Sequence, residues 1–186
     1  MLENFFSFFG VEPVGLDEGN LAESFVDRLG GSSFGDGIMF AIRPSDLAMW
    51  RENLCAAYPG SDGPPRPFAY DWLGDCLAEV EGRQGREVAI FEIGSGSVLR
   101  TGASAERFLN REVPDHHDQS LVSPFWEAWV SSGGAQPKYG QCVGYKVPLF
   151  LGGRDEVGNL ELSDVDVYWT ILAQLIARNA GGGPRS

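Results

Sequence analysis

Hydrophobic positions in the first third of the chain follow two different spacings. Apolar residues recur every fourth position over residues 17–29, which predicts an amphipathic helix that ends at two consecutive glycines. A short, continuous apolar run at residues 38–42 predicts a buried strand. A second helix is predicted over residues 44–58, because a proline stands in its first turn and a Pro-Gly pair follows its last.

The middle of the chain predicts a sheet. Residues 59–67 contain four prolines and two glycines, which predicts a surface loop and disfavours both a helix and a central strand. Short apolar runs follow, each separated from the next by a glycine-containing break, at residues 68–72, 76–81, 87–93 and 98–101. This spacing is typical of an antiparallel meander.

Helical spacing returns in the last third of the chain. Helices are predicted over residues 104–112 and 123–130, and extended segments over residues 143–151 and 159–162. A final helix, predicted over residues 163–178, has apolar positions at helical spacing and should dock on the core. The predicted fold class is α+β, with an antiparallel central sheet, a meander, packed by several helices.

The length of 186 residues indicates one domain. We expect a single α+β domain over residues 1–180, with a helix-strand-helix part at residues 1–58. The core sheet and the C-terminal helices should occupy residues 68–178. Residues 181–186, which are rich in glycine and proline, are expected to form a disordered tail.

Charge restricts the class of partner. The chain has 26 acidic and 14 basic residues, a formal net charge of −12. Nucleic acids and anionic membranes are recognised by basic surfaces, so we expect neither as a direct partner. If the charge has a role beyond solubility, the partner is a basic protein.

The start of the chain and the three cysteines indicate a cellular compartment. The first ten residues carry Glu3 and no basic residue, unlike a secretory signal, and no apolar run approaches the roughly 20 residues that span a bilayer. Cys55, Cys76 and Cys142 lie far apart and show no metal-ligand spacing, which argues against a disulfide framework or a zinc site. We therefore expect a soluble, cytoplasmic protein with reduced thiols.

One segment suggests a nucleophile. Residues 140–144, Gly-Gln-Cys-Val-Gly, fit the nucleophile elbow of hydrolases with Cys142 as the nucleophile. That elbow requires a following helix, which Pro148 interrupts, and a histidine later in the chain, whereas His116 and His117 precede the cysteine. A core cysteine is the favoured interpretation.

Two further segments invite a cofactor or metal hypothesis. His116 and His117 lie between two aspartates, but adjacent side chains point apart, so a solvated loop or helix start is favoured over a metal site. Residues 94–97, Gly-Ser-Gly-Ser, lack the later glycine and lysine of a phosphate loop and are interpreted as a hairpin turn. We therefore expect no catalytic, cofactor-binding or metal-binding residues.

Three stretches together resemble a known bacterial family. The first is Phe-Ala-Tyr-Asp-Trp-Leu-Gly at residues 68–74, followed by the hairpin at residues 89–96. The second is Phe-Trp-Glu-Ala-Trp at residues 125–129. The third and most specific is Gly-Gln-Cys-Val-Gly-Tyr-Lys-Val-Pro-Leu-Phe-Leu-Gly-Gly at residues 140–153, which continues through residues 159–169. They resemble the C-terminal domain of type VI secretion immunity proteins, which neutralise a secreted DNase toxin.

The resemblance covers roughly residues 33–177, including residues 34–40, which look like part of a shortened GAD-like region. It implies a protein without enzymatic activity that binds and occludes a cognate toxin, a basic nuclease whose phosphate-binding surface attracts an acidic chain. Our candidate toxin-facing residues are acidic groups near the start of the last helix: Asp155, Glu156, Glu161, Asp164 and Asp166.

Two alternatives remain open. The chain could be a regulatory module that binds a small ligand in a groove between sheet and helices, or a small cysteine hydrolase that uses Cys142.

Overall fold

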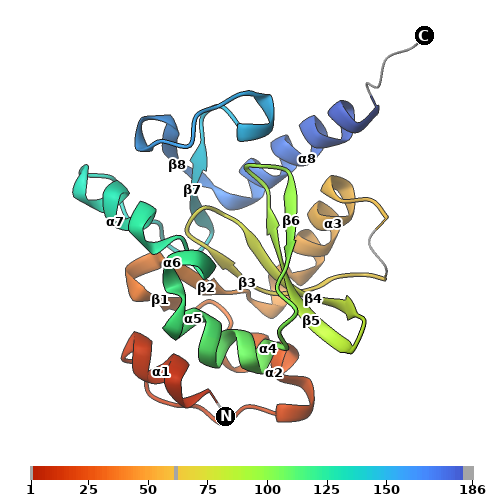
Figure 1. Ribbon diagram of the computed structural model, residues 1–186, viewed down its shortest axis with the longest axis vertical. Coiled ribbons are helices and arrows are strands. Elements are labelled where there is room, and N and C mark those ends of the chain that lie inside the picture. The colour runs from red at the N-terminus through yellow and green to blue at the C-terminus, as the bar shows by residue number, and fades with distance from the viewer. Residues whose placement is uncertain (1, 61–62, 182–186) are drawn as a thin grey trace.

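The computed structural model describes residues 2–60 and 63–181 as a sheet with helices on both faces (Figure 1). The final helix extends to Gly181, beyond the predicted end near residue 178. The rest of the predicted tail, residues 182–186, lies outside the described residues. Within the described ranges, no helix is long and apolar enough to cross a membrane.

Six strands form one antiparallel sheet in sequence order. They are β1 (Ser33–Phe34), β2 (Met39–Ala41), β3 (Arg66–Asp71), β4 (Cys76–Gly82), β5 (Gly85–Glu92) and β6 (Ser97–Arg100). The predicted meander is confirmed as β3 to β6. β2 also pairs directly with β3, so the N-terminal part of the chain completes the same sheet.

The start of β3 corrects the predicted loop. Arg66 and Pro67 are the first two residues of this strand rather than the end of a loop. Pro67 lies beyond Ala69, the last residue that pairs with β2, and beside a bulge in the pairing with β4. A proline fits there because the ladder is interrupted where its amide donor is missing.

Helices cover both faces of the sheet (Figure 1). One face is covered by α1 (Glu3–Phe9), α2 (Leu21–Leu29), α4 (Ala105–Arg107), the π-helical turn Phe108–Glu112 and α5 (Val113–Asp115). The other is covered by α3 (Leu47–Ala57) and α8 (Val165–Gly181), which pack against each other. Two further helices, α6 (His117–Ser120) and α7 (Ser123–Ser131), follow α5. Short 3-10 turns span Glu18–Asn20, Gly35–Gly37, Pro44–Asp46, Leu149–Leu151 and Val157–Asn159.

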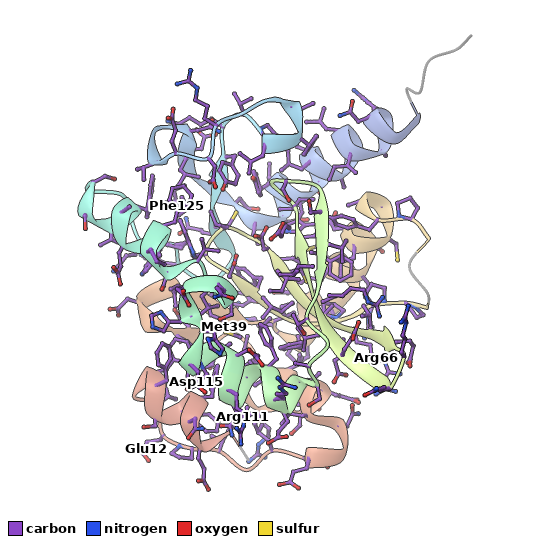
Figure 2. All side chains as sticks on the ribbon, in the orientation of Figure 1. Glu12, Met39, Arg66, Arg111, Asp115 and Phe125 are labelled. Carbon is purple, nitrogen blue, oxygen red and sulfur yellow. The ribbon has the colours of Figure 1, made fainter. Side chains whose placement is uncertain are left out.

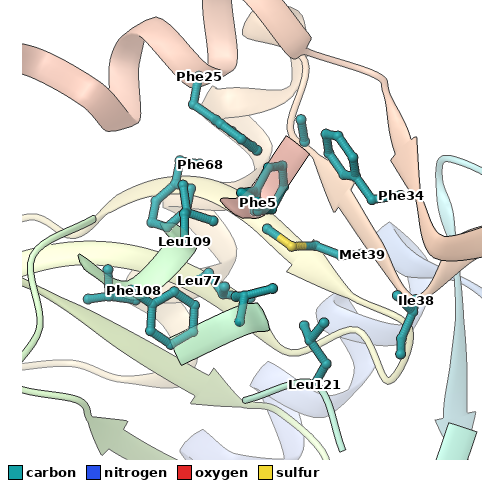
Figure 3. Close-up of a cluster of buried hydrophobic side chains, with 14 of the residues drawn as sticks. Phe5, Phe25, Phe34, Ile38, Met39, Phe68, Leu77, Phe108, Leu109 and Leu121 are labelled. Atoms are coloured by element: carbon teal, nitrogen blue, oxygen red, sulfur yellow. The ribbon is translucent and has the colours of Figure 1, made fainter. Parts of the chain in front are cut away.

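The core consists of two apolar layers separated by the sheet. The layer under α1 and α2 is rich in phenylalanine, with Phe5, Phe25, Phe34 and Phe68 gathered around Met39 (Figure 3). The opposite layer holds large aromatic side chains of α3 and α8. Successive residues of a strand point to opposite faces, so β4 and β5 are apolar at consecutive positions rather than alternating.

The predicted docking of the last helix is confirmed. The indole nitrogen of Trp169 in α8 donates a hydrogen bond of 2.7 Å to the carbonyl of Gly74, in the turn between β3 and β4. Its ring meets Trp50 of α3 edge to face, with 5.4 Å between centroids. α8 is therefore fixed both to the sheet and to its neighbouring helix.

Candidate functional site

The C-terminal third builds a small second sheet beside α8 (Figure 1). β7 (Gln141–Tyr145) pairs antiparallel with β8 (Leu160–Asp164). The predicted extended segment at residues 143–151 is correct only as far as Tyr145, because the chain turns at Pro148 and residues 149–151 form a 3-10 turn.

Close contacts hold this sheet on α8. A β-carbon at Gly144 would lie 2.4 Å from the ring of Tyr168, so only glycine allows the helix to approach the strand. The Tyr145 amide donates to the Tyr168 hydroxyl at 3.0 Å, and the Val143 amide donates to the Trp72 carbonyl at 2.6 Å. Gly144 and Tyr168, which both belong to the family-like stretches, thus have structural roles.

The loop between β7 and β8 is held together by Asn159. Its side chain accepts a hydrogen bond from the Val147 amide and donates to the Val147 and Arg154 carbonyls, at 2.8 to 3.0 Å. The Tyr145 hydroxyl adds a 2.7 Å hydrogen bond to the carboxylate of Asp155. Such side-chain bonds to backbone groups fix a loop that has little regular structure of its own.

The five predicted acidic residues all lie exposed at this end of the molecule, but they do not form one cluster. Asp155 and Glu156 belong to the loop before β8. Glu161 and Asp164 line a groove between β8 and α8. Asp166 points to the other side of the helix start, where the Asn53 amide of α3 is 3.4 Å from its carboxylate.

Besides Asp166, two of these carboxylates have structural partners. One oxygen of Asp164, Oδ1, accepts hydrogen bonds from the Asp166 and Val167 amides at 3.0 and 3.1 Å and so caps the N-terminus of α8. The helix therefore starts two residues after the predicted position, because Ser163 still belongs to β8 and the cap is Asp164. Asp155 is bound by Tyr145, as described above.

The groove between β8 and α8 has a volume of about 340 Å³. Its helix side is apolar, with Val167 and Ile171 one turn apart and 56% and 53% exposed. Lys146, Pro148 and Glu161 line the opposite side. Large aliphatic side chains this exposed, grouped at a groove with a charged border, are typical of a protein interaction surface.

The sequence prediction missed Val167 and Ile171. Both lie off the stripe of α8 that docks on the core, which is made by Val165, Tyr168, Trp169 and Leu172. Their spacing of four residues places them together on a second face of the helix. The sequence does contain a signal for this surface, namely two apolar residues four positions apart that lie outside the stripe of α8 that docks on the core.

Charge alone does not single out this surface. Residues 1–60 carry nine acidic and three basic side chains, whereas residues 141–186 carry five and four. Residues 1–60 therefore contribute six of the twelve net negative charges and residues 141–186 only one, so the acidic excess is not concentrated at the C-terminal surface; Glu12 of the N-terminal segment is labelled in Figure 2. Exposed apolar side chains beside carboxylates distinguish the C-terminal surface.

The structure contradicts a nucleophilic role for Cys142. Its side chain is fully buried in β7, and the chain continues as a strand instead of turning into a helix. Burial, together with the carboxylates of Asp71, Asp75 and Asp164, raises the pKa of the thiol well above its usual value. A neutral, buried thiol cannot attack a substrate.

The remaining sequence candidates also have structural roles. His117 begins α6, where its Nδ1 lies 2.6 Å from the Ser123 hydroxyl, and its ring packs against Phe8. Among the described residues, no group of three or more histidine, cysteine, aspartate or glutamate side chains could hold a metal ion. The turn between β5 and β6 is formed by residues 93–96, so the predicted hairpin turn is confirmed for residues 94–96, whereas Ser97 is the first residue of β6.

Comparison with solved structures shows a shared fold. The crystal structure of Atu4351 from Agrobacterium tumefaciens matches with a TM-score of 0.58 and 18% sequence identity, over 94% of this chain and 89% of that chain. No curated protein sequence matches the chain. At this identity the similarity concerns the fold alone.

Comparison with family models gives a match within the C-terminal part. The matching model is described as T6SS immunity protein Tdi1, C-terminal, and it covers residues 107–176. The second and third family-like stretches lie in this segment, whereas the first, at residues 68–74, lies outside it. The match is therefore narrower than the expected range of residues 33–177. The resemblance is confirmed over residues 107–176, where the chain matches the model of the C-terminal domain of T6SS immunity protein Tdi1.

Proposed function

We propose that this protein binds a cognate toxin of a type VI secretion system and neutralises it by occlusion, without catalysing a reaction. The observation that carries this proposal is the family match over residues 107–176, since an immunity protein acts by toxin neutralisation. We propose further that the toxin is a nuclease and that the complex forms in the cytoplasm. A net charge of −12 supports a partner with a basic, phosphate-binding surface.

We propose that residues 1–180 act as one domain. β2 from the N-terminal part pairs with β3, and α3 packs on α8, so the parts before and after residue 59 share one sheet and one core layer. We also propose the five acidic residues, Asp155, Glu156, Glu161, Asp164 and Asp166, as part of the toxin-facing surface. All five are exposed, and two of them, Glu161 and Asp164, line an apolar groove, which supports this choice.

A neutralisation assay tests the proposal. The purified protein is mixed with the toxin domain encoded beside its gene, and cleavage of plasmid DNA is followed. We expect an equimolar amount to abolish cleavage, because occlusion is stoichiometric. An unrelated DNase serves as the control and should remain active, which separates specific binding from nonspecific capture by an acidic protein. Undiminished cleavage by the cognate toxin at equimolar and tenfold excess would contradict the proposal.

A further inference from the structure

We infer, on the basis of the proposed function, that the groove between β8 and α8 is the anchor site for the toxin. The groove would receive an aliphatic or aromatic side chain of the toxin against Val167 and Ile171. A basic side chain of the same toxin segment would lie against Glu161 and Asp164.

The apolar half of this inference follows from exposure. Val167 and Ile171 are more than half exposed, although most large apolar side chains of the chain are buried. Covering such a pair with a partner side chain removes apolar surface from water, which favours association. Interfaces gain most of their affinity from a few side chains of this kind that become fully buried.

The charged half follows from the carboxylates that border the groove. Glu161 is exposed, and its side chain lies on the face of β8 that lines the groove. Both capping bonds of Asp164 use Oδ1, and within residues 2–60 and 63–181 no hydrogen bond to Oδ2 is formed. The carboxylate oxygens of Glu161 and Oδ2 of Asp164 can therefore accept hydrogen bonds from an arginine or lysine of the partner.

Lys146, the single basic side chain among the described residues that line the groove, does not pair with Glu161 or Asp164. The ammonium group of Lys146 donates to the Gly158 carbonyl at 2.9 Å, in the loop before β8. The groove therefore carries two carboxylates and one ammonium group, and the ammonium group is already bound. A basic partner side chain complements this balance, and an acidic one does not.

The walls of the groove are fixed before binding. Asn159 holds the loop, Asp164 caps the helix, and Tyr168 locks β7 onto α8. A preformed site loses little conformational entropy when it binds, which raises affinity.

A matched pair of variants on one helix tests the anchor. Ile171→Arg places a long, charged side chain in the groove, and Thr170→Arg places the same side chain on an exposed neighbouring position that does not line it. We expect Ile171→Arg to raise the Kd for a catalytically inactive form of the toxin domain by at least about 100-fold. Thr170→Arg should change it by less than about threefold. Isothermal titration calorimetry measures both.

Truncating the groove side chains to alanine tests whether binding depends on their contacts with the toxin, without the steric obstruction that an arginine introduces. Val167→Ala and Ile171→Ala should each raise the Kd by about tenfold or more, the loss typical of a buried anchor residue. Because both side chains are more than half exposed in the free protein, neither change should alter its thermal unfolding. Glu161→Gln, which removes one carboxylate, should lower the association rate constant and leave the dissociation rate less affected.

The outcomes separate the groove from the proposed function. If the wild-type protein neutralises the toxin and Ile171→Arg binds as tightly as Thr170→Arg, the groove is not the anchor. If the wild type does not bind the toxin, both the function and the groove are contradicted. A wild-type dimer in sedimentation experiments that Ile171→Arg dissociates would assign the groove to a second copy of the chain and overturn the inference.

Discussion

The carboxyl groups of Asp71 and Asp75 lie buried at the turn between β3 and β4. Asp71 Oδ1 accepts hydrogen bonds from the Leu73 and Asp75 amides, and Asp75 Oδ1 accepts one from the Ile93 amide across the sheet. Burial raises the pKa of Asp71 to about 7 and also raises the pKa of Asp75, which the neighbouring Asp71 raises further. The two residues thus organise the turn that receives Val143 and Trp169.

This pair predicts a pH dependence of stability. A raised pKa means that the folded state binds protons more tightly than the unfolded state, so the free energy of unfolding should fall as pH rises from about 4 to about 7. Asp71→Asn keeps an oxygen for the two amides and cannot ionise. We expect it to reduce this fall by about 1–2 kcal/mol, measured by urea unfolding between pH 5 and 8. Asp118→Asn, at an exposed position, should leave the slope of the wild type unchanged.

Gly144 tests whether the family-like stretch is structural. Gly144→Ala would place a methyl group 2.4 Å from the Tyr168 ring, so the helix or the ring must move. We expect a loss of roughly 2–3 kcal/mol in the free energy of unfolding, the cost of overpacking a core contact. The matched control is Gly158→Ala, because a β-carbon at Gly158 has no neighbour within 4 Å. Equal effects of the two substitutions would contradict a specific contact at Gly144.

At the scale of elements, α8 begins at an acidic cap that also borders the groove. Asp164→Ala removes the side-chain acceptor for two helix amides and should cost about 1 kcal/mol of stability. Asp164→Asn keeps an oxygen acceptor and removes the charge, so its unfolding should stay close to that of the wild type. Toxin binding that weakens in the asparagine variant would then report the charge rather than the cap. Equal thermal unfolding of all three proteins would show that the cap contributes nothing.

The elements missed by sequence reasoning are short or lack a regular period. α1 has seven residues, four of them phenylalanine, and too few turns to display an apolar stripe. β1 has only two residues and exists because β2 pairs with it. The longer elements, α2, α3, α7 and α8, were predicted within a few residues because each repeats its apolar spacing over two or more turns.

At the scale of the whole molecule, most of the acidic excess lies in a different part of the chain from the exposed apolar pair. The N-terminal 60 residues hold half of the acidic excess, the last 46 residues hold one twelfth of it, and the exposed apolar pair lies on α8. Arg66, at the start of β3, lies away from the β7–β8 end (Figure 2). Electrostatic attraction of a basic partner therefore comes from charges spread over the whole molecule. Burial of apolar surface by that partner is confined to the groove.

This division predicts which charges control the rate of toxin binding. Raising the ionic strength from 0.05 to 0.5 M should lower the association rate constant by about tenfold or more and change the dissociation rate far less. Glu156→Gln, in the loop that leads into β8, should lower the rate at low salt more than Glu12→Gln, in the N-terminal segment away from that end of the molecule (Figure 2). Stopped-flow fluorescence measures these rates. Equal effects of the two substitutions would show that the toxin docks elsewhere.

The sequence by itself determined the α+β class, the meander and the docked last helix. Each rests on local periodicity, glycine breaks or capping residues, which act over a few neighbouring positions. It also carried the second and third family-like stretches, which lie in the segment that matches the immunity-protein family model, residues 107–176.

Only the tertiary structure decided how distant segments meet. It placed β2 beside β3, buried Cys142 under α8, and divided the five acidic candidates between a loop, a groove and the α3 side of the helix. It also left Val167 and Ile171 exposed, although their residue types favour burial. The physical reason is that burial depends on which elements pack together, and the packing partners of a helix lie far away in the sequence.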